Sequence, residues 1–209
     1  MNAEVLDFFR EHAAPGRIGL IGSANSLYQI IREGQRPLTK DGKLSNYNHV
    51  FLIGSARDDG RKDGGIYIFE SDLQVSLHDR EIKNGLMESR LVKWCLDDLE
   101  FAAVLGMELS DEENQALLRN ALWFTYDESH LSYPVTELLG TIWAMQTGRM
   151  QKTNVFYKEH AAQCATFARL CYQSIGRDFI ESGTHPSNTT PEEISQSPLF
   201  TFRKYWSKN

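Results

Sequence analysis

The sequence predicts an α+β fold that forms a single domain over residues 1–209. Two β-rich runs, at 48–56 (NHVFLIGSA) and 65–73 (GIYIFESDL), are separated by a polar segment with glycines, which is typical of an antiparallel hairpin. Apolar residues recur at helical spacing elsewhere, most clearly from Cys164 onward. The 209 residues, 41% of them apolar, suffice to bury the core of one ordinary domain, and no low-complexity linker divides them.

The N-terminal part of the chain is predicted to begin with a helix, a strand and a second helix. Apolar residues lie on one side of 1–12, which indicates a short amphipathic helix. Residues 17–22 (RIGLIG) form a brief β-rich run that ends at glycine, and 26–33 suit a short helix. The two strands of the hairpin follow these elements.

Residues from about 76 to 150 are expected to form a helical insertion. Ser110 and Glu113 have the spacing of a capping box, in which each side chain satisfies a free amide of the other residue. Pro134 suits the first position of the next helix, where its missing N–H costs nothing. The aromatic residues of this stretch are expected to lie in the core, or alternatively to cover an apolar acyl pocket.

The C-terminal part is predicted to contain the Cys164 helix, a second capped helix and a strand. Gly176 is placed to end the Cys164 helix. Thr190 and Glu193 form a second capping box, with proline at the first helical position. The apolar stretch 199–206 is predicted to be the last strand.

Charge and composition argue against several classes of function. A net charge of −6 and an isoelectric point near 5.5 do not suit a nucleic-acid-binding surface. No run approaches the roughly 18 apolar residues of a spanning helix, so stable membrane insertion is not expected. The first residues carry acids early and do not read as a signal peptide, which favours a cytoplasmic location.

The cysteines and histidines are not arranged as metal ligands. Three cysteines, an odd number without a CxxC motif, favour free thiols over a disulfide framework or a zinc site. No pair of histidines has the spacing of HExxH or another metal-binding helix. No metal and no other cofactor is therefore predicted.

The hairpin is predicted to place an acid beside a histidine. If the turn is centred near 59–60, facing positions sum to about 119, and His49 then faces Glu70 on the same side of the sheet. The same register puts Phe51 opposite Ile68 on one apolar face. A carboxylate beside an imidazole selects its tautomer and stabilises the imidazolium, as a general base requires. The alternative is a solvated histidine and an unrelated acid at a sheet edge.

Cys164 is predicted to lie in the first turn of a helix. Ala168, Cys171 and Ile175 share its face, which continues into the expected core. Free backbone amides and the helix dipole at this position favour a reactive thiolate, and the backbone N–H of Cys164 is available to an oxyanion. The alternative is a small buried apolar residue. That alternative is the expected state of Cys171 and Cys95.

Several segments together resemble a known family. GRIGLIG, NYNHV followed by IFESD, SYPVTELLG, HAAQCATFARLCYQSIG and NTTPEEISQSP are similar, in this order, to the circularly permuted NlpC-like papain-fold proteins of the YiiX and YaeF type. The lecithin retinol acyltransferase-like enzymes are more distant permuted relatives. The resemblance runs from about Gly16 to Phe200. It implies a papain-like fold in which a small antiparallel sheet packs against the helix that bears the nucleophile.

The resemblance also implies roles for individual residues. Cys164 would be the nucleophile, His49 the base, and Glu70 the residue that orients the base. The order is permuted, because the cysteine helix of ordinary papain-like enzymes precedes the histidine strand. Tyr133 resembles a tyrosine that supports the oxyanion site. Independently of the resemblance, Tyr47 alternates with His49 along the chain, so it either reaches the site or packs beside it.

The predicted function is that of a cysteine-dependent hydrolase, similar to an amidase or peptidase, that forms an acyl-enzyme through a Cys-His-Glu triad. One alternative is a lipid acyltransferase or thioesterase with the same triad, and another is a non-catalytic binding module on the same fold. The expected partner is a small peptide or a lipid acyl substrate. A lipid enzyme should have a long apolar groove beside Cys164, whereas a peptidase should have polar or charged groups for a peptide amine or carboxylate.

Overall fold

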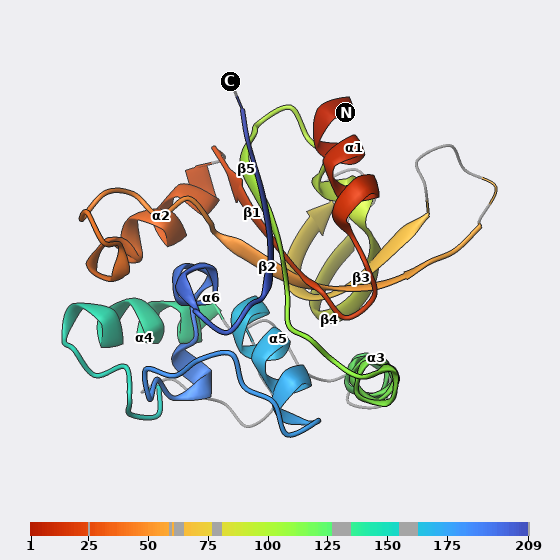
Figure 1. Cartoon of the computed structure of the whole chain (residues 1–209). Coiled ribbons are helices and arrows are strands. Elements are labelled where there is room, and N and C mark those ends of the chain that lie inside the picture. Colours follow the sequence, from red (N-terminus) through yellow and green to blue (C-terminus); the bar gives the residue numbers. More distant parts are fainter. Residues whose placement is uncertain are drawn as a thin grey trace.

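The computed structural model describes residues 1–24, 26–58, 60, 65–76, 81–126, 135–154 and 163–208. This part of the chain is an α+β structure built on a six-stranded antiparallel sheet of order β4-β3-β2-β1-β5-β6 (Figure 1). The strands are β1 (Ile18–Ser23), β2 (His49–Ala56), β3 (Ile66–Ser76), β4 (Glu81–Arg90), β5 (Leu99–Gly106) and β6 (Phe202–Ser207). The α+β class predicted from the sequence is confirmed at this level.

Helices cover the sheet on both faces. The α-helices are α1 (Ala3–His12), α2 (Ser26–Gly34), α3 (Asp111–Tyr126), α4 (Val135–Gln146), α5 (Cys164–Gln173) and α6 (Pro191–Gln196). Short 3-10 turns are η1 (Arg36–Leu38), η2 (Leu91–Trp94) and η3 (Pro186–Asn188). Figure 1 shows α1 and α5 on opposite sides of the central strands. None of the helices in the described ranges is long and apolar enough to cross a membrane.

The central strand β2 contributes to two apolar cores. Phe51 and Ile53 pack in the core that contains the buried side of α1. Val50 and Leu52 pack in the core that contains α5 and Cys164. Because successive side chains of a strand point to opposite faces, a strand covered on both sides reads as a continuous apolar run. This explains the uninterrupted VFLI of the sequence, and it places α5 directly on the strand that begins with His49.

The predicted helical insertion at about 76–150 is wrong in its first part. β4 pairs with β3 along ten residue positions, and β5 lies between β1 and β6 with partners on both sides. Only α3 and α4 match the helical prediction within the described residues. A short apolar run such as that of β5 (LEFAAVLG) suits a helix or a buried strand equally well by its periodicity. Backbone pairing with β1 on one side and β6 on the other makes this segment a strand.

The two predicted helix caps, at the starts of α3 and α6, are present. The Ser110 backbone N–H donates to Glu113 Oε2 at 2.8 Å, and the Glu113 N–H donates to Ser110 Oγ at 3.2 Å, which confirms the capping box of α3. Thr190 Oγ1 accepts from the Glu193 N–H at 3.2 Å at the start of α6. The strand expected at 199–206 is β6. Pro134 lies outside the described residues.

The register of the predicted hairpin differs from the expectation by two residues. Leu52 pairs with Phe69 and Ile53 with Ile68, so facing positions sum to 121 rather than 119. A bulge or irregularity shifts the register between Ile53 and Ala56, and Ala56 pairs with Ile66. A shift of two residues keeps every side chain on its face, whereas a shift of one would reverse all of them. His49 and Glu70 are therefore diagonal neighbours rather than directly opposed residues.

Candidate active site

The predicted histidine and acid form a buried pair. His49 is the first residue of β2 and is 3% exposed, and Glu70 on β3 is fully buried. His49 Nε2 lies 2.8 Å from Glu70 Oε2. Diagonal positions on neighbouring strands are within reach of long side chains, so the pair forms despite the shifted register.

Two residues of η2 complete the surroundings of Glu70. Trp94 Nε1 donates to Glu70 Oε2 at 2.9 Å, and the centroid of its ring lies 4.6 Å from that of His49. Lys93 Nζ lies 2.5 Å from Glu70 Oε1 and 3.0 Å from Asp72 Oδ2. The sequence prediction missed both residues, because it placed them in a helical insertion. Nothing in the local sequence around Lys93 and Trp94 indicates a contact with Glu70. The contact forms because β4 pairs with β3 and η2 follows β4 directly.

These donors keep the buried carboxylate ionised. Burial alone raises the pKa of Glu70, but the hydrogen bond and the attraction of His49, together with the Lys93 ammonium, lower it to about 2. An opposite charge and hydrogen bonds to the charged form both favour ionisation. Glu70 is therefore an anion at neutral pH, and it stabilises positive charge on the imidazole.

Cys164 is the first residue of α5, as predicted, and is 5% exposed. Gln163 precedes it in an extended conformation as the N-cap residue. The Cys164 N–H belongs to the first turn of the helix, whose amides have no intrahelical acceptor. The position therefore combines amide donors with the positive end of the helix dipole.

His49 links the thiol to the carboxylate. Burial lowers the pKa of His49, but attraction to Cys164 and a hydrogen bond with its side chain outweigh burial and, with Glu70, raise the pKa to about 10. Because Nε2 faces Glu70, Nδ1 is the ring nitrogen left for the sulfur. The three predicted residues thus lie together as thiol, imidazole and carboxylate, with the imidazole protonated at neutral pH.

The other two cysteines lie in different surroundings. Cys95 and Cys171 form no disulfide bond and are fully buried. Burial raises the pKa of Cys171, which lies two turns further along α5. A neutral thiol in an apolar core is unreactive.

Of the two predicted tyrosines, Tyr47 is within the described residues and Tyr133 lies outside them. Tyr47 is buried in the core that contains Cys164, and burial raises the pKa of its hydroxyl. Its carbonyl accepts from Gln35 Nε2 at 2.8 Å. The structure therefore places Tyr47 in the packing around the site, and it does not line the cavity beside the thiol.

A small cavity lies beside Cys164, between α2, α4, the start of α5 and the segment before α6. Its lining residues are Ile31, Gln35, Asn48, Thr141, Ile142, Met145, Gln163, Cys164, Ala165, Thr189, Thr190 and Pro191. The cavity volume is about 20 Å³, which is room for about one water molecule. Apart from the thiol itself, the lining residues within the described ranges have apolar, amide and hydroxyl side chains.

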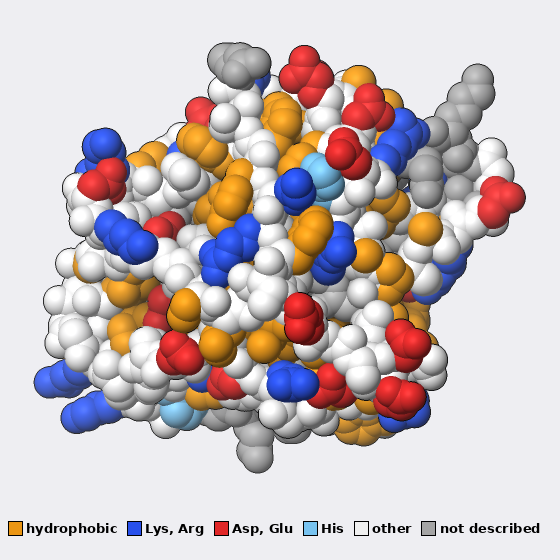
Figure 2. Space-filling view, viewed as in Figure 1, with side chains coloured by type: hydrophobic (Ala, Val, Ile, Leu, Met, Phe, Trp, Pro, Cys, Tyr) orange, Lys and Arg blue, Asp and Glu red, His pale blue; other side chains and the backbone are white. Residues whose placement is uncertain are grey.

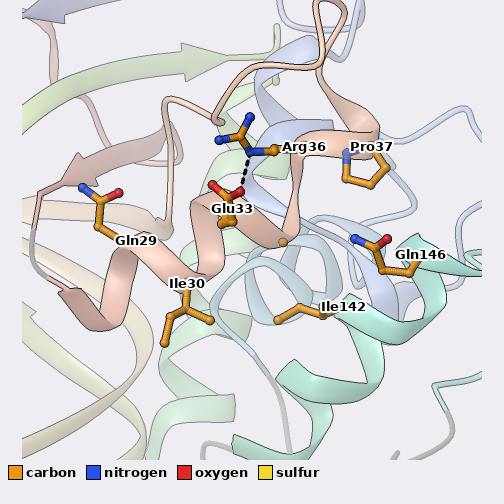
Figure 3. Close-up of a pocket in the computed structure, with 8 residues that line it drawn as sticks. Gln29, Ile30, Glu33, Arg36, Pro37, Ile142 and Gln146 are labelled. Carbon is orange, nitrogen blue, oxygen red and sulfur yellow. Dashed lines mark ion pairs between the residues drawn. The ribbon is translucent and has the colours of Figure 1, made fainter.

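Ile142 lines this cavity and also a larger groove between α2 and α4. The groove has a volume of about 730 Å³, and Ile30, Pro37 and Ile142 supply much of its apolar surface (Figure 3). Glu33 and Arg36 form an ion pair of 2.6 Å at its edge, so their charges largely cancel. The groove offers space for an apolar group.

On the face shown in Figure 2, acidic and basic side chains are interspersed with apolar ones. Within the described ranges, no group of three or more His, Cys, Asp or Glu side chains is arranged to hold a metal ion.

No family model and no curated protein matches this sequence.

Proposed function

We propose that this protein is a cysteine-dependent hydrolase, similar to an amidase or peptidase, on a circularly permuted papain-like fold. The observation that carries the proposal is the buried imidazole of His49 between the Cys164 thiol and the Glu70 carboxylate. An antiparallel sheet packed on the helix that bears the cysteine supports the fold assignment, and the chain order His, Glu, Cys supports the permutation. A nucleophile, a base and a residue that orients the base are the elements of thiol acyl transfer.

The geometry suits a two-step acyl transfer. The Cys164 thiolate attacks the substrate carbonyl, and the Cys164 N–H, a free amide of the first helical turn, stabilises the oxyanion. The His49 imidazolium gives its proton to the leaving nitrogen or oxygen, which departs and leaves a thioester on Cys164. The neutral imidazole then takes a proton from water, whose oxygen attacks the thioester. The acid is released, and the thiolate and imidazolium are restored.

Lys93 and Trp94 support this chemistry through Glu70. Trp94 donates a hydrogen bond to its carboxylate, and Lys93 forms an ion pair with it. They keep Glu70 ionised and fixed in place, and Glu70 in turn keeps the imidazole oriented. They are positioning residues in the proposed mechanism.

A lipid acyltransferase or thioesterase is the second candidate. The apolar groove between α2 and α4 favours it, because Ile30, Pro37 and Ile142 suit a hydrocarbon chain better than a charged peptide end. The same Cys-His-Glu triad would attack a thioester or ester. The two candidates differ in the acyl group and share the acyl-enzyme.

Iodoacetamide should label Cys164 at least roughly 100-fold faster than Cys95 or Cys171, because only Cys164 is paired with an imidazolium at a helix start. Replacing His49 with glutamine should lower the Cys164 rate by roughly the same factor, since the stabilising positive charge is lost. Mass spectrometry of the three cysteine peptides over time measures the rates in the folded protein. Equal, slow labelling of all three would favour a binding module instead.

Amide hydrolysis should fall as the pH rises through about 10, while alkylation of Cys164 should not fall. The raised pKa of His49 keeps the imidazole protonated below about 10 and lets it lose the proton above. Protonation of the leaving nitrogen requires the imidazolium, whereas alkylation requires only the thiolate. The measurement is the pH dependence of kcat/KM for N-acetylglycyl 4-nitroanilide beside that of the labelling rate. An alkaline limb near the ordinary histidine pKa would contradict the thiolate–imidazolium pair.

A further inference from the structure

Gln163, the residue directly before Cys164, does not cap α5 with its side chain. It is the N-cap residue, with φ −69° and ψ 161°, and its side chain makes no capping hydrogen bond within the described structure. Its backbone carbonyl accepts from the Phe167 N–H at 2.8 Å. The side chains preferred at an N-cap are those of Ser, Thr, Asp and Asn, which accept from amides of the first turn. Gln163 therefore provides these amides with no side-chain acceptor of its own.

The Gln163 side chain is held instead by Thr141 on α4. Gln163 Nε2 donates to Thr141 Oγ1 at 2.9 Å, and Asn154 Nδ2 donates to the same oxygen at 3.0 Å. The Thr141 hydroxyl donates in turn to the Ser187 carbonyl at 3.4 Å. Thr141 is 2% exposed and Gln163 is 5% exposed. A hydroxyl that donates one bond and accepts two uses its full capacity, so the nitrogen of the Gln163 amide must face Thr141.

The packing of α4 brings Thr141 close enough for this contact. Gly140 precedes Thr141, and a Cβ atom at Gly140 would lie 1.9 Å from Asn154 Oδ1. On the other side of Thr141, Ile142 packs against Gly34 of α2, where a Cβ atom would lie 2.9 Å from Ile142 Cγ1. Glycine is unfavourable inside a helix, so Gly140 is explained by the close approach of Asn154. Both neighbours of Thr141 thus fix this turn of α4 in place.

From these contacts we infer that Thr141 is a positioning residue for the nucleophile and acts through Gln163. It holds the Gln163 amide away from the first turn of α5 and fixes the backbone from which the Cys164 N–H extends. Because the peptide bond is planar, rotation about ψ of Gln163 turns its carbonyl and the Cys164 N–H together. The inference rests on the proposed function, in which that N–H stabilises the oxyanion.

The test compares two reactions of Cys164 that differ in their need for an oxyanion site. Acylation by N-acetylglycyl phenyl thioester passes through a tetrahedral oxyanion and is measured by release of thiophenol. Alkylation by iodoacetamide displaces iodide at a saturated carbon and forms no oxyanion. Both reactions require the thiolate, so the ratio of acylation to alkylation rates is independent of how much thiolate is present. A merely structural role would lower the unfolding midpoint without changing this ratio.

Variants of Thr141 test the hydroxyl. Thr141→Val removes it at nearly the same volume and should lower the ratio by about 10- to 100-fold, because the oxyanion donor is no longer held in place. Thr141→Ser keeps the hydroxyl and should keep most of the wild-type ratio. Thr125→Val is the matched control, since Thr125 is 5% exposed on α3 and donates to the Ala121 carbonyl at 2.8 Å. It loses an equally buried hydroxyl and should keep the wild-type ratio.

A double variant tests whether Thr141 acts through Gln163. Gln163→Leu removes the same hydrogen bond from the other side and should lower the ratio by about the same factor as Thr141→Val. The protein that carries both changes should have a ratio no lower than that of either single variant, because the two residues act through one bond. The thermal unfolding midpoint of each variant shows that it is folded during the assay.

The outcomes separate this inference from the proposed function. A wild-type ratio in Thr141→Val, an equal loss in Thr141→Ser, or single losses that multiply in the double variant overturn the role of Thr141 and leave the hydrolase proposal standing. No acylation of Cys164 in the wild-type protein overturns the proposed function, and the inference fails with it. If Thr141→Val does not fold, Gln163→Leu decides the question, and a wild-type ratio there overturns the inference.

Discussion

Replacement of Cys164 with alanine should abolish acyl-enzyme formation and leave the protein folded. The change removes only the sulfur from a small side chain at the start of α5, and alanine is the most favourable residue in a helix. Loss of a nucleophile that acts with a base lowers kcat by a factor on the order of 10⁶. The measurement is the intact mass after incubation with N-acetylglycyl phenyl thioester, beside the thermal unfolding midpoint.

Cys171→Ala is the matched control for this experiment. Cys171 lies on the same helix and is fully buried, so its replacement also removes one sulfur from the core. We expect this variant to form the acyl-enzyme at the wild-type rate and to lose about 1 kcal/mol of unfolding free energy. A Cys164→Ala protein that still becomes acylated would refute the assignment of the nucleophile.

Glu70→Gln should lower kcat by about 10²- to 10⁴-fold, because a neutral amide no longer stabilises the imidazolium or selects its tautomer. The substitution preserves size and leaves an oxygen for Trp94, so it tests the charge rather than the packing. It should also move the alkaline limb of kcat/KM below the wild-type position, since Glu70 contributes to the raised pKa of His49. If Glu70 had a purely structural role, its replacement would change kcat without shifting the alkaline limb of the pH dependence of kcat/KM.

Asp72→Asn is the control for the charge change at Glu70. Asp72 also pairs with Lys93, at 3.0 Å, but Glu70 is the carboxylate that contacts His49. We expect its kcat to stay within about threefold of the wild type, as is usual for a partner outside the reacting groups. If Asp72→Asn were as inactive as Glu70→Gln, the effect would belong to the ion pairs around Lys93 as a group and not to Glu70 alone.

Acid unfolding gives a second readout of Glu70. Its folded-state pKa of about 2 lies below the ordinary value of 4.5, so its contribution to stability is present above about 4.5 and is lost as the pH falls toward 2. The contribution converts to roughly 3 kcal/mol. Denaturant titrations at several pH values should show this acid-dependent loss in the wild-type protein and its absence in Glu70→Gln.

The candidate triad illustrates why part of the site was predictable. Cys164 follows from a helical pattern within one segment, and the pairing of His49 with Glu70 from two neighbouring strands. The predicted register was wrong by two residues, yet the shared face survived because the side-chain period of a strand is two. A turn centre and a bulge depend on few residues with weak preferences, so counting from an assumed centre gave the wrong facing pairs.

The surroundings of the triad were not predictable in the same way. Lys93 and Trp94 reach Glu70 because β4 pairs with β3 and η2 follows β4 directly. The sequence of β4 and β5 has no period that excludes a helix, so their state depends on strands far away in the chain.

The sequence by itself determined the ends of the helices, the α+β class, the position of Cys164 in a first helical turn and the common face of His49 and Glu70. These features depend on hydrogen bonds and side-chain periods within a few residues or across one hairpin. Only the tertiary structure decided the sheet order, the donors around Glu70 and the cavity beside Cys164. Each of these requires segments distant in the chain to pack together, and packing free energy depends on all of the neighbours at once.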